Sequence, residues 1–474
     1  MDMTGVHDIN PRALQEITPG QAWHYAVVPI DTSDTLITLL AAESLSGSGM
    51  DELELLTGKR VSVVRQPAET IEGLLCRHYP QDHPDLRKQD AFYTGNPEQF
   101  LTHMISEAKS LKSSDIHIEA FEESCRVRIR IDGMLLQRYL LDKKQYPSII
   151  NKIKIIANLD IAEKRLPQDG RIFFSHNDEK FDIRASVLPT LHGEKIVLRL
   201  LNNNTAGIDL LQLGLHADEL SSYLESIRRP NGMILISGPT GSGKTTTLYA
   251  TLRILNKQTR NILTIEDPIE YTLEGINQVQ LRENIGLSFS AALRTFLRQD
   301  PDIIMLGEIR DADTANMAIR TALTGHLVLS TVHTNSAWGI ISRLADMGMP
   351  AFLIANTLNT VVAQRLVRLL CPDCKKKQPQ PAMYPPNFTP PRRPAEHFTA
   401  TGCSHCYNTG YRGRKGIYEV IPIDRELSEQ IKKSNYDVQQ LLKEKGFRSL
   451  AENAFELFEQ HLTSLEEIYP ILIN

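Results

Sequence analysis

The chain reads Gly238-Pro239-Thr240-Gly241-Ser242-Gly243-Lys244-Thr245, which has the spacing GxxxxGK[ST] of a phosphate-binding loop. The apolar run MILIS (233–237) precedes this stretch, and the helical pattern TTTLYATLRIL (245–255) follows it. A strand, a glycine-rich loop and a helix in this order are typical of an α/β fold with a parallel sheet. The alternative is a glycine-rich turn without a ligand, and the strand and helix on either side argue against it.

The residue types of the loop suit phosphate chemistry. Glycines allow successive backbone N–H groups to turn inward around phosphate oxygens, and the helix N-terminus adds its positive dipole end. We expect Lys244 to reach the β- and γ-phosphates of ATP, and Thr245 to ligate Mg²⁺. The residues expected to contact the nucleotide are Gly238, Pro239, Thr240, Gly241, Ser242, Gly243, Lys244, Thr245, Thr246 and Glu266.

Two acidic groups follow apolar runs that read as strands. The run DIIMLGE ends at Glu308, and Gly307 stands where many phosphate-loop enzymes carry an Mg²⁺-binding aspartate. Glu308 is therefore the candidate that polarises the attacking water. The run ILTIE ends at Glu266, with Asp267 and Glu270 behind it, and at least one of these acids should hold Mg²⁺ directly or through water. The alternative is that these acids cap helices or lie in solvated loops.

Other patterns divide the remaining chain. Apolar strands alternate with helical segments over 210–474, and a helical tail covers about 425–473. Alternating runs around one helical segment predict an α+β domain over 100–204, and shorter alternating runs predict a small α/β domain over 10–80. The polar stretch 80–99 between these two has no apolar period and reads as a linker.

Composition limits the function classes. The 474 residues include 52 Lys and Arg against 57 Asp and Glu, so the formal charge of -5 argues against a protein that coats nucleic acid. No run of eighteen apolar residues predicts a membrane span, and the N-terminus lacks the pattern of a signal peptide. These features predict a cytosolic protein whose cysteines are reduced.

Four cysteines form two CxxC pairs on either side of a proline-rich stretch, 379–394. The pairs are Cys371 with Cys374 and Cys403 with Cys406, and together they can complete a tetrahedral Zn²⁺ site. Four thiolates leave no open ligand position, so the metal would be structural in a module over 371–406. Disulfide pairing is the competing interpretation, and His405 is a spare ligand. Cys76 and Cys125 read as small core residues.

The motifs resemble those of a known family. IEDPIEY (265–271), LRQDPDIIMLGEIRD (297–311) and TGHLVLSTVHTN (324–335) follow the phosphate loop in the order seen in secretion ATPases of the type II secretion and type IV pilus class. The resemblance covers about 113–420. It implies a RecA-like C-terminal domain, a preceding PAS-like domain, and a homohexameric ring at the cytoplasmic side of the inner membrane.

The resemblance also implies roles for single residues. Glu308 is the catalytic glutamate, the acids around Glu270 resemble the aspartate box, and His326 and His333 resemble the histidine box. Either histidine, taken alone, is more often a satisfied core or loop residue, and the flanking TGH…STVHTN pattern makes a functional role as readily expected. The α+β domain supplies arginines that resemble the family's transition-state arginines, although strand arginines also pair with surface carboxylates. The preferred candidates are Arg171 and Arg184, followed by Arg128, Arg130 and Arg199.

The cysteine module and the N-terminal unit refine this resemblance. Both are similar to parts of type II secretion ATPases and pilus extension ATPases, and retraction motors generally lack them. We therefore expect a motor that assembles a pseudopilus for type II secretion, with a pilus extension motor as the alternative. Expected partners are inner-membrane platform and docking proteins, with membrane contact through those proteins and no direct nucleic-acid binding. A DNA-translocating ATPase and a non-hydrolysing nucleotide-binding scaffold remain as rival interpretations.

Overall fold

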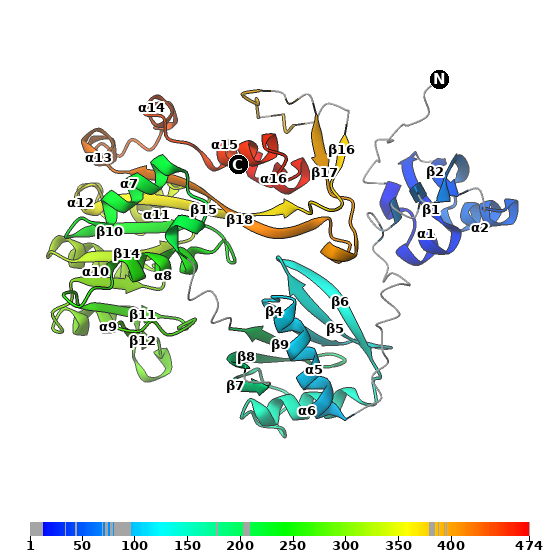
Figure 1. Ribbon diagram of the computed structural model, residues 1–474, viewed down its shortest axis with the longest axis horizontal. Helices are drawn as coiled ribbons and strands as arrows, with labels where there is room; N and C mark the ends of the chain where they lie inside the picture. Colours follow the sequence, from blue (N-terminus) through cyan, green and yellow to red (C-terminus); the bar gives the residue numbers. More distant parts are fainter. Residues whose placement is uncertain are drawn as a thin grey trace.

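The computed structural model describes residues 13–473 apart from 34, 43–44, 69, 72–73, 76–78, 80–95, 177–178, 202–208, 379–383, 387, 393 and 395. Cys76, most of the expected linker at 80–99 and the expected boundary near residue 204 lie outside these described residues. Three separate units are visible along the chain in Figure 1, each with its own sheet.

The largest unit is built on a seven-stranded sheet with the order β12-β11-β13-β14-β10-β15-β18. Every neighbouring pair is parallel except β15 and β18, which run antiparallel. The strands predicted from the apolar runs MILIS, ILTIE and DIIMLGE are confirmed as β10, β11 and β13. The strands are β10 (Gly232–Ser237), β11 (Ile262–Glu266), β12 (Asn277–Gln280), β13 (Ile303–Leu306), β14 (Leu327–Val332), β15 (Leu358–Leu370) and β18 (Tyr411–Pro422).

Helices cover both faces of this sheet, because alternate side chains of its strands are apolar on both sides. In β10, for example, Ile234 and Ile236 belong to one core, and Met233 and Leu235 belong to the other. The first face carries α7 (Ala217–Ile227) and α8 (Lys244–Leu255). The second face packs α9 (Phe289–Phe296), α10 (Ala312–Leu323), α11 (Gly339–Asp346), α12 (Ala351–Thr357), α13 (Arg425–Lys432), α15 (Leu450–Glu459) and α16 (Leu465–Leu472).

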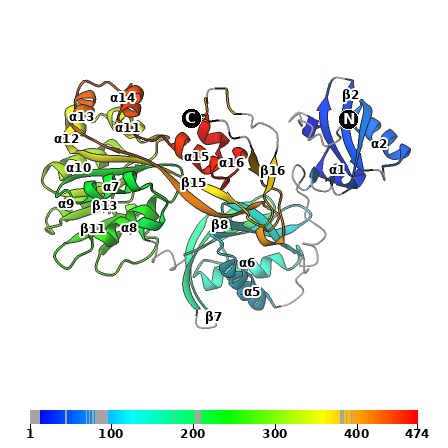
Figure 2. The same ribbon diagram turned by 45° about the horizontal axis from the view of Figure 1, so that its top comes forward.

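The middle unit is an antiparallel six-stranded sheet with the order β6-β5-β4-β9-β8-β7. Its helices α5 (Pro97–Ser110) and α6 (Tyr146–Ile156) lie together against one face, as Figure 2 shows, and the other face carries mostly charged and polar side chains. The strands are β4 (Asp115–Ala120), β5 (Cys125–Ile131), β6 (Met134–Leu141), β7 (Gln168–His176), β8 (Glu179–Thr190) and β9 (Gly193–Leu200).

The N-terminal unit is a three-stranded sheet with its own apolar core. Its strands are β1 (Val27–Thr32), β2 (Leu36–Ala42) and β3 (Arg60–Gln66). The described helices of this unit include α1 (Pro19–Tyr25) and α2 (Gly47–Thr57). No described helix of the protein has both the length and the apolar character that a membrane span requires.

Among the described residues, polar contacts join the middle unit to the largest unit at two places. The Asp132 carboxylate accepts a hydrogen bond from the backbone N–H of Gly413 at 2.8 Å and pairs with Arg414 at 3.2 Å. The second contact joins Arg184 of β8 to the segment that follows β11, where the guanidinium donates to the carbonyl oxygen of Ile269. Both contacts are polar, so the interface includes charged groups.

Candidate active site and cysteine cluster

The phosphate loop connects β10 to α8 at the carboxyl edge of the parallel strands. Gly238, Gly241 and Gly243 have φ angles of +147°, +82° and +88°, which residues with a Cβ rarely adopt. At Gly238 a Cβ would also meet the carbonyl oxygen of Gln364 at 2.5 Å. Conformation therefore requires glycine at all three positions, and at Gly238 the lack of space for a Cβ requires it as well.

Lys244 begins α8 and folds back over the loop. Its ammonium group donates to the carbonyl oxygens of Gly238 at 2.7 Å and Pro239 at 2.9 Å. Burial lowers the pKa of Lys244, the nearby charge of Glu308 opposes that shift, and Arg365 adds to it. A half-buried ammonium that is bonded only to neutral carbonyls would gain from an anion in the loop, which fits a phosphate ligand.

Glu308 follows β13 and lies beside two candidate partners. Its carboxylate forms an ion pair with Arg310, and its second oxygen is 3.3 Å from Nε2 of His333. His326 lies at the other end of β14, where its Nδ1 is 3.0 Å from the carbonyl oxygen of Thr321. The structure therefore brings His333 to the candidate catalytic glutamate, and it does not bring His326 there.

The acids after β11 differ from one another in their surroundings. Burial raises the pKa of Glu266, whose carboxylate accepts hydrogen bonds from Thr264 at 2.6 Å, Gln278 at 3.1 Å and Tyr249. Its oxygens are thus already used by protein donors. Glu270 instead faces the middle unit, at 3.6 Å from the guanidinium of Arg184. Of these acids, Glu266 is the one least available to a metal ion in this conformation.

Four arginines and one aspartate form a row across the open face of the six-stranded sheet. The pairing register places Arg171 opposite Arg184, Arg184 opposite Arg199, Arg199 opposite Asp115, and Asp115 opposite Arg130. Burial lowers the pKa of Arg184, Glu270 opposes the shift, and Arg171 and Arg199 add to it. The row contains four arginines and one aspartate, so its positive charges outnumber its negative charge. Arginines on opposing strands also repel one another.

The five candidate arginines have different partners. Arg171 pairs with Asp182, Arg128 pairs with Glu119 at 2.8 Å, and both remain within their own sheet. Arg199 and Arg130 share Asp115, at 3.1 Å and 3.4 Å. Among the described residues, Arg184 is the candidate arginine that contacts the unit carrying the phosphate loop.

The structure adds two residues that the motifs did not indicate. Gln364 of β15 is buried, accepts a hydrogen bond from Thr247 at 2.9 Å, and lies against Gly243. Arg365, the next residue, contacts Gly238. The sequence contains a signal for both residues, because Gln364 and Arg365 interrupt the apolar run LNTVVAQRLVRLL of a buried strand.

The four cysteines gather at the far end of β15 and β18. Their sulfur atoms all lie within 4.8 Å of one another, with 3.7 Å between Cys374 and Cys406 and 3.9 Å between Cys371 and Cys403. A tetrahedron with Zn–S bonds of about 2.3 Å has edges of about 3.8 Å, whereas a disulfide needs about 2.0 Å. The arrangement fits a tetrahedral metal and not disulfides. His405 points to Asp373 instead, with Nδ1 at 3.1 Å from the carboxylate.

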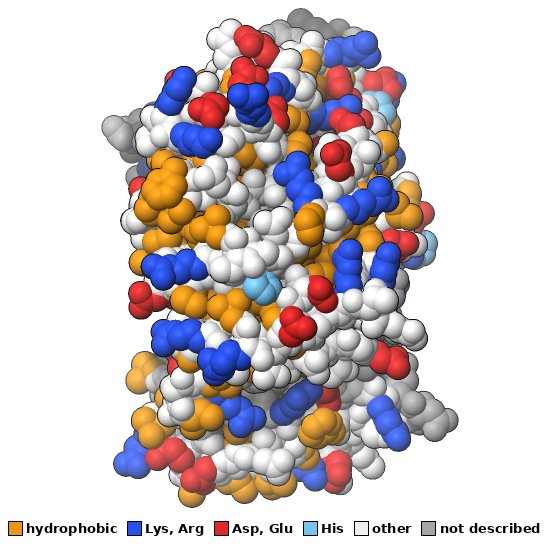
Figure 3. Space-filling model, turned by 90° about the vertical axis from the view of Figure 1, so that its left-hand side faces the viewer, with side chains coloured by type: hydrophobic (Ala, Val, Ile, Leu, Met, Phe, Trp, Pro, Cys, Tyr) orange, Lys and Arg blue, Asp and Glu red, His pale blue; other side chains and the backbone are white. Residues whose placement is uncertain are grey.

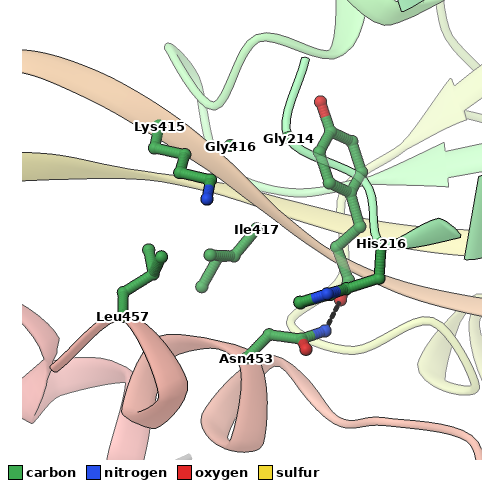
Figure 4. A pocket seen from close by; sticks show the side chains of 8 residues that line it. Gly214, His216, Lys415, Gly416, Ile417, Asn453 and Leu457 are labelled. Carbon is green, nitrogen blue, oxygen red and sulfur yellow. Dashed lines mark hydrogen bonds between the residues drawn. The ribbon is translucent and has the colours of Figure 1, made fainter. Parts of the chain in front are cut away.

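A small hollow lies between residues 214–216, which precede α7, the strand β18 and the helix α15, as Figure 4 shows. Asn453 at its edge donates hydrogen bonds to Glu219 at 2.8 Å and to the carbonyl oxygen of Tyr418 at 2.5 Å. These two hydrogen bonds connect the C-terminal helix α15 to α7 and to β18.

The side of the largest unit shown in Figure 3 mixes basic, acidic and hydrophobic side chains, without the continuous basic stripe of a DNA-binding surface.

Comparisons with known proteins agree with these features. The family model described as type II/IV secretion system protein matches residues 93–470, and the MshEN domain model matches residues 5–85. The type II secretion system ATPase E of Vibrio cholerae is 44% identical over 402 residues, which cover 84% of this chain and 79% of that protein. The type II secretion system protein E of Aeromonas hydrophila is 38% identical, covering 97% of both.

A pilus protein is similar too. The type IV pilus assembly ATPase PilB of Myxococcus xanthus is 39% identical over 97% of this chain and 87% of its own length. Among solved structures, the pilus retraction motor PilT with bound ADP has a TM-score of 0.53 at 27% identity, covering 77% of this chain and 95% of that one. The ATPase DotB of Legionella pneumophila has a TM-score of 0.62 at 22% identity, covering 81% and 98%, which shows the fold alone.

Proposed function

The chain belongs to the type II/IV secretion system protein family, and on that premise we propose that it is a ring-forming ATPase that powers assembly of a pseudopilus for type II secretion. The observation that carries the proposal is that the phosphate loop with Lys244 and the Glu308–His333 pair lie at the same carboxyl edge of the parallel sheet, inside a match that spans 93–470. Those residues supply what ATP hydrolysis needs, namely a phosphate cradle, a carboxylate and a polar neighbour.

We propose the following roles in hydrolysis. Lys244 leaves the loop carbonyls and binds the β- and γ-phosphates of ATP, while the loop glycines present their backbone N–H groups. Glu308 accepts the proton of the attacking water, with His333 holding the carboxylate in place. Thr245 and an acid of the 267–270 segment would hold Mg²⁺, which would supply positive charge next to the phosphates, whereas the oxygens of Glu266 are already hydrogen-bonded.

The arginine row supports a shared site. Its unbalanced positive charge would be relieved by phosphate oxygens, and Arg184 already lies beside the segment after β11. We therefore propose Arg184 as a transition-state arginine, acting on its own chain or on a neighbouring subunit as the units close. Closure and reopening of this interface would turn hydrolysis into motion within a homohexamer.

The domain assignment follows the same family. We propose a docking domain over 10–80, a PAS-like domain over 100–204 and a RecA-like ATPase domain over 210–474, with a structural zinc module at 371–406. The support is the three separate sheets and the sulfur spacing of the cysteine cluster. The docking domain and the zinc module would meet inner-membrane platform and docking proteins on the cytoplasmic side.

A pilus extension motor is the second candidate, because the PilB relative covers nearly the whole chain at 39% identity. The test replaces Lys244 by Ala in the host and scores secreted proteins in the medium and pili on the cell surface. Lost secretion with intact pili supports the proposed motor. Lost pili with intact secretion would replace it by the second candidate, and loss of neither would reject both.

A further inference from the structure

Arg365 lies where β15 passes the start of the phosphate loop. Strands β10 and β15 pair in parallel up to Ser237 and Ala363, so β15 continues alongside the loop with Gln364 and Arg365. A Cβ on Gly238 would lie 3.2 Å from Nη1 of Arg365, which shows that the guanidinium packs directly on the first glycine. The side chain is half-buried at this position.

The guanidinium of Arg365 bridges two parts of the site. Nη1 donates to the carbonyl oxygen of Gln364 at 3.0 Å, and Nη2 donates to the carbonyl oxygen of Asn335 at 2.9 Å. Asn335 belongs to residues 333–337, the histidine segment, which begins with His333. One planar group therefore connects the strand beside the phosphate loop with the segment whose first residue contacts Glu308.

The histidine segment has two other attachments to the same part of the sheet. Ser237, the last residue of β10, donates its hydroxyl to the carbonyl oxygen of Ser336 at 3.3 Å. The backbone N–H of Ala337 donates to the buried carboxylate of Glu419 at 3.2 Å. These bonds hold the C-terminal end of the segment, and Arg365 holds its middle, nearer to His333.

We propose that Arg365 is a positioning residue that fixes the histidine segment against the phosphate loop, so that His333 stays on Glu308 when nucleotide is bound. This inference rests on the proposed ATP hydrolysis at the same site. Arg365 acts through backbone carbonyls and through His333, and it need not touch the phosphates. Its positive charge near Lys244 also favours an anion in the loop.

The test uses Arg365→Lys in the full-length protein. Lysine keeps the charge, but its single ammonium nitrogen lacks the planar fork that places separate donors on the carbonyl oxygens of Gln364 and Asn335. We expect kcat for ATP to fall about tenfold while KM and the Kd for Mg·ADP change by less than about threefold, as expected when positioning and not binding is lost. Arg365→Gln, which lacks the charge, should lose kcat as well. The control Arg368→Lys lies on the same strand and faces Glu467, and it should keep wild-type kcat and KM.

A double-substitution cycle separates positioning from other roles. If Arg365 acts through His333, Arg365→Lys should change kcat by less than about twofold in a His333→Ala background. A full tenfold loss in that background, an effect confined to KM or Kd, or a wild-type kcat in Arg365→Lys would overturn the inference.

Hydrogen exchange gives a readout independent of turnover. In the wild type, Mg·ADP should protect backbone amides both in 238–247 and in 333–338, and in Arg365→Lys only the first stretch should remain protected. Equal protection of 333–338 in both proteins would also overturn the inference. Absence of ATP turnover in the wild type would instead reject the proposed function, so the two failures are distinguishable.

Discussion

The two large sheets of the protein are stabilised in different ways. The seven-stranded sheet buries both faces under helices. Successive residues of its central strands belong in turn to the apolar core on one face and to the apolar core on the other. The six-stranded sheet buries one face under α5 and α6 and exposes charged groups on the other. Covered faces leave only strand ends free for chemistry, which is where the phosphate loop and Glu308 lie. The open face instead presents a row of arginines, each paired with Asp115, Asp182 or Glu270.

The open face is stabilised by ion pairs as well as by its apolar core. Burial alone would raise the pKa of Glu119, but hydrogen bonds from Arg128, Lys195 and Arg126 outweigh that effect and lower its pKa to about 2. The contrast teaches that one sheet depends on packing and the other partly on ionisation. Substitutions in the two sheets should therefore affect different observables, and the four below run from the largest to the smallest expected effect on turnover.

Lys244→Ala should nearly abolish ATP hydrolysis at the phosphate loop, which lies at a strand end of the seven-stranded sheet. ATP turnover should fall by about a thousandfold or more, since the ammonium stabilises charge on the transferred phosphoryl group. Steady-state phosphate release measures the loss. The exposed Lys257 lies just beyond α8, and Lys257→Ala should retain wild-type turnover. Retained turnover in Lys244→Ala would mean that the loop does not bind the hydrolysed phosphates.

Arg184→Ala should show what the open face contributes to the same reaction. We expect about a hundredfold loss of turnover with nucleotide binding within about threefold, because a transition-state arginine acts after binding. Its cross-strand neighbour Arg171, which pairs with Asp182, is the matched comparison. The family resemblance predicts a loss for Arg171→Ala too, and the contacts seen here predict a smaller one. Near-normal turnover in both variants would remove the arginine row from the mechanism.

Cys374→Ser should affect metal content far more than turnover. The wild-type chain should contain about one zinc, and the variant should contain much less, because three thiolates and a hydroxyl bind zinc weakly. We expect the thermal midpoint to fall by several degrees and turnover to change by less than about threefold. Elemental analysis and calorimetry are the measurements. A zinc-free wild type with reduced thiols would contradict the assignment.

Glu119→Gln should leave turnover unchanged and lower only the stability of the open sheet. A carboxylate whose pKa falls from 4.5 to about 2 on folding stabilises the protein above pH 4.5, and this contribution disappears as the pH falls toward 2. The variant should therefore lose up to about 3 kcal/mol of unfolding free energy at pH 7 and differ little from the wild type near pH 2.

Urea unfolding of the middle unit, followed from pH 2 to pH 7, tests the sign of this effect. Glu123→Gln, at an exposed glutamate of the neighbouring turn, is the control and should match the wild type throughout. A constant difference between Glu119→Gln and the wild type over the whole range would show that packing, and not ionisation, explains the loss.

Much of the phosphate site could be predicted from sequence, because its signals are local. The loop from Gly238 to Thr245 needs glycine torsions, and Glu308 follows an apolar strand that is short and fully buried. The number of residues between His326 and His333 already indicated that the two side chains lie far apart. A six-residue strand fits between them and places them at its opposite ends.

Long-range pairing could not be predicted in the same way. Strands β15 and β18 are 40 residues apart along the chain between Leu370 and Tyr411, and nothing local in either strand specifies that they pair or that they pass the phosphate loop. The position of Arg365 depends on that pairing and on the parallel register with β10. The choice of Arg184 over Arg171 likewise depends on how two units meet, which alternating patterns within one unit do not encode.

The strand pair β15 and β18 also has a mechanical meaning. Beyond Ala363 the pair extends past the end of β10 for seven more residues before it reaches the cysteines, a length of about 24 Å. The far part of the pair is bonded to the C-terminal helices, because Arg368 contacts Glu467 and Tyr411 contacts Ser464. One continuous strand pair therefore connects the phosphate loop, the C-terminal helices and the cysteine cluster. A tilt of the pair by roughly 5° at the phosphate loop would move its far end, the helices bonded to it and the cysteines together by about 2 Å.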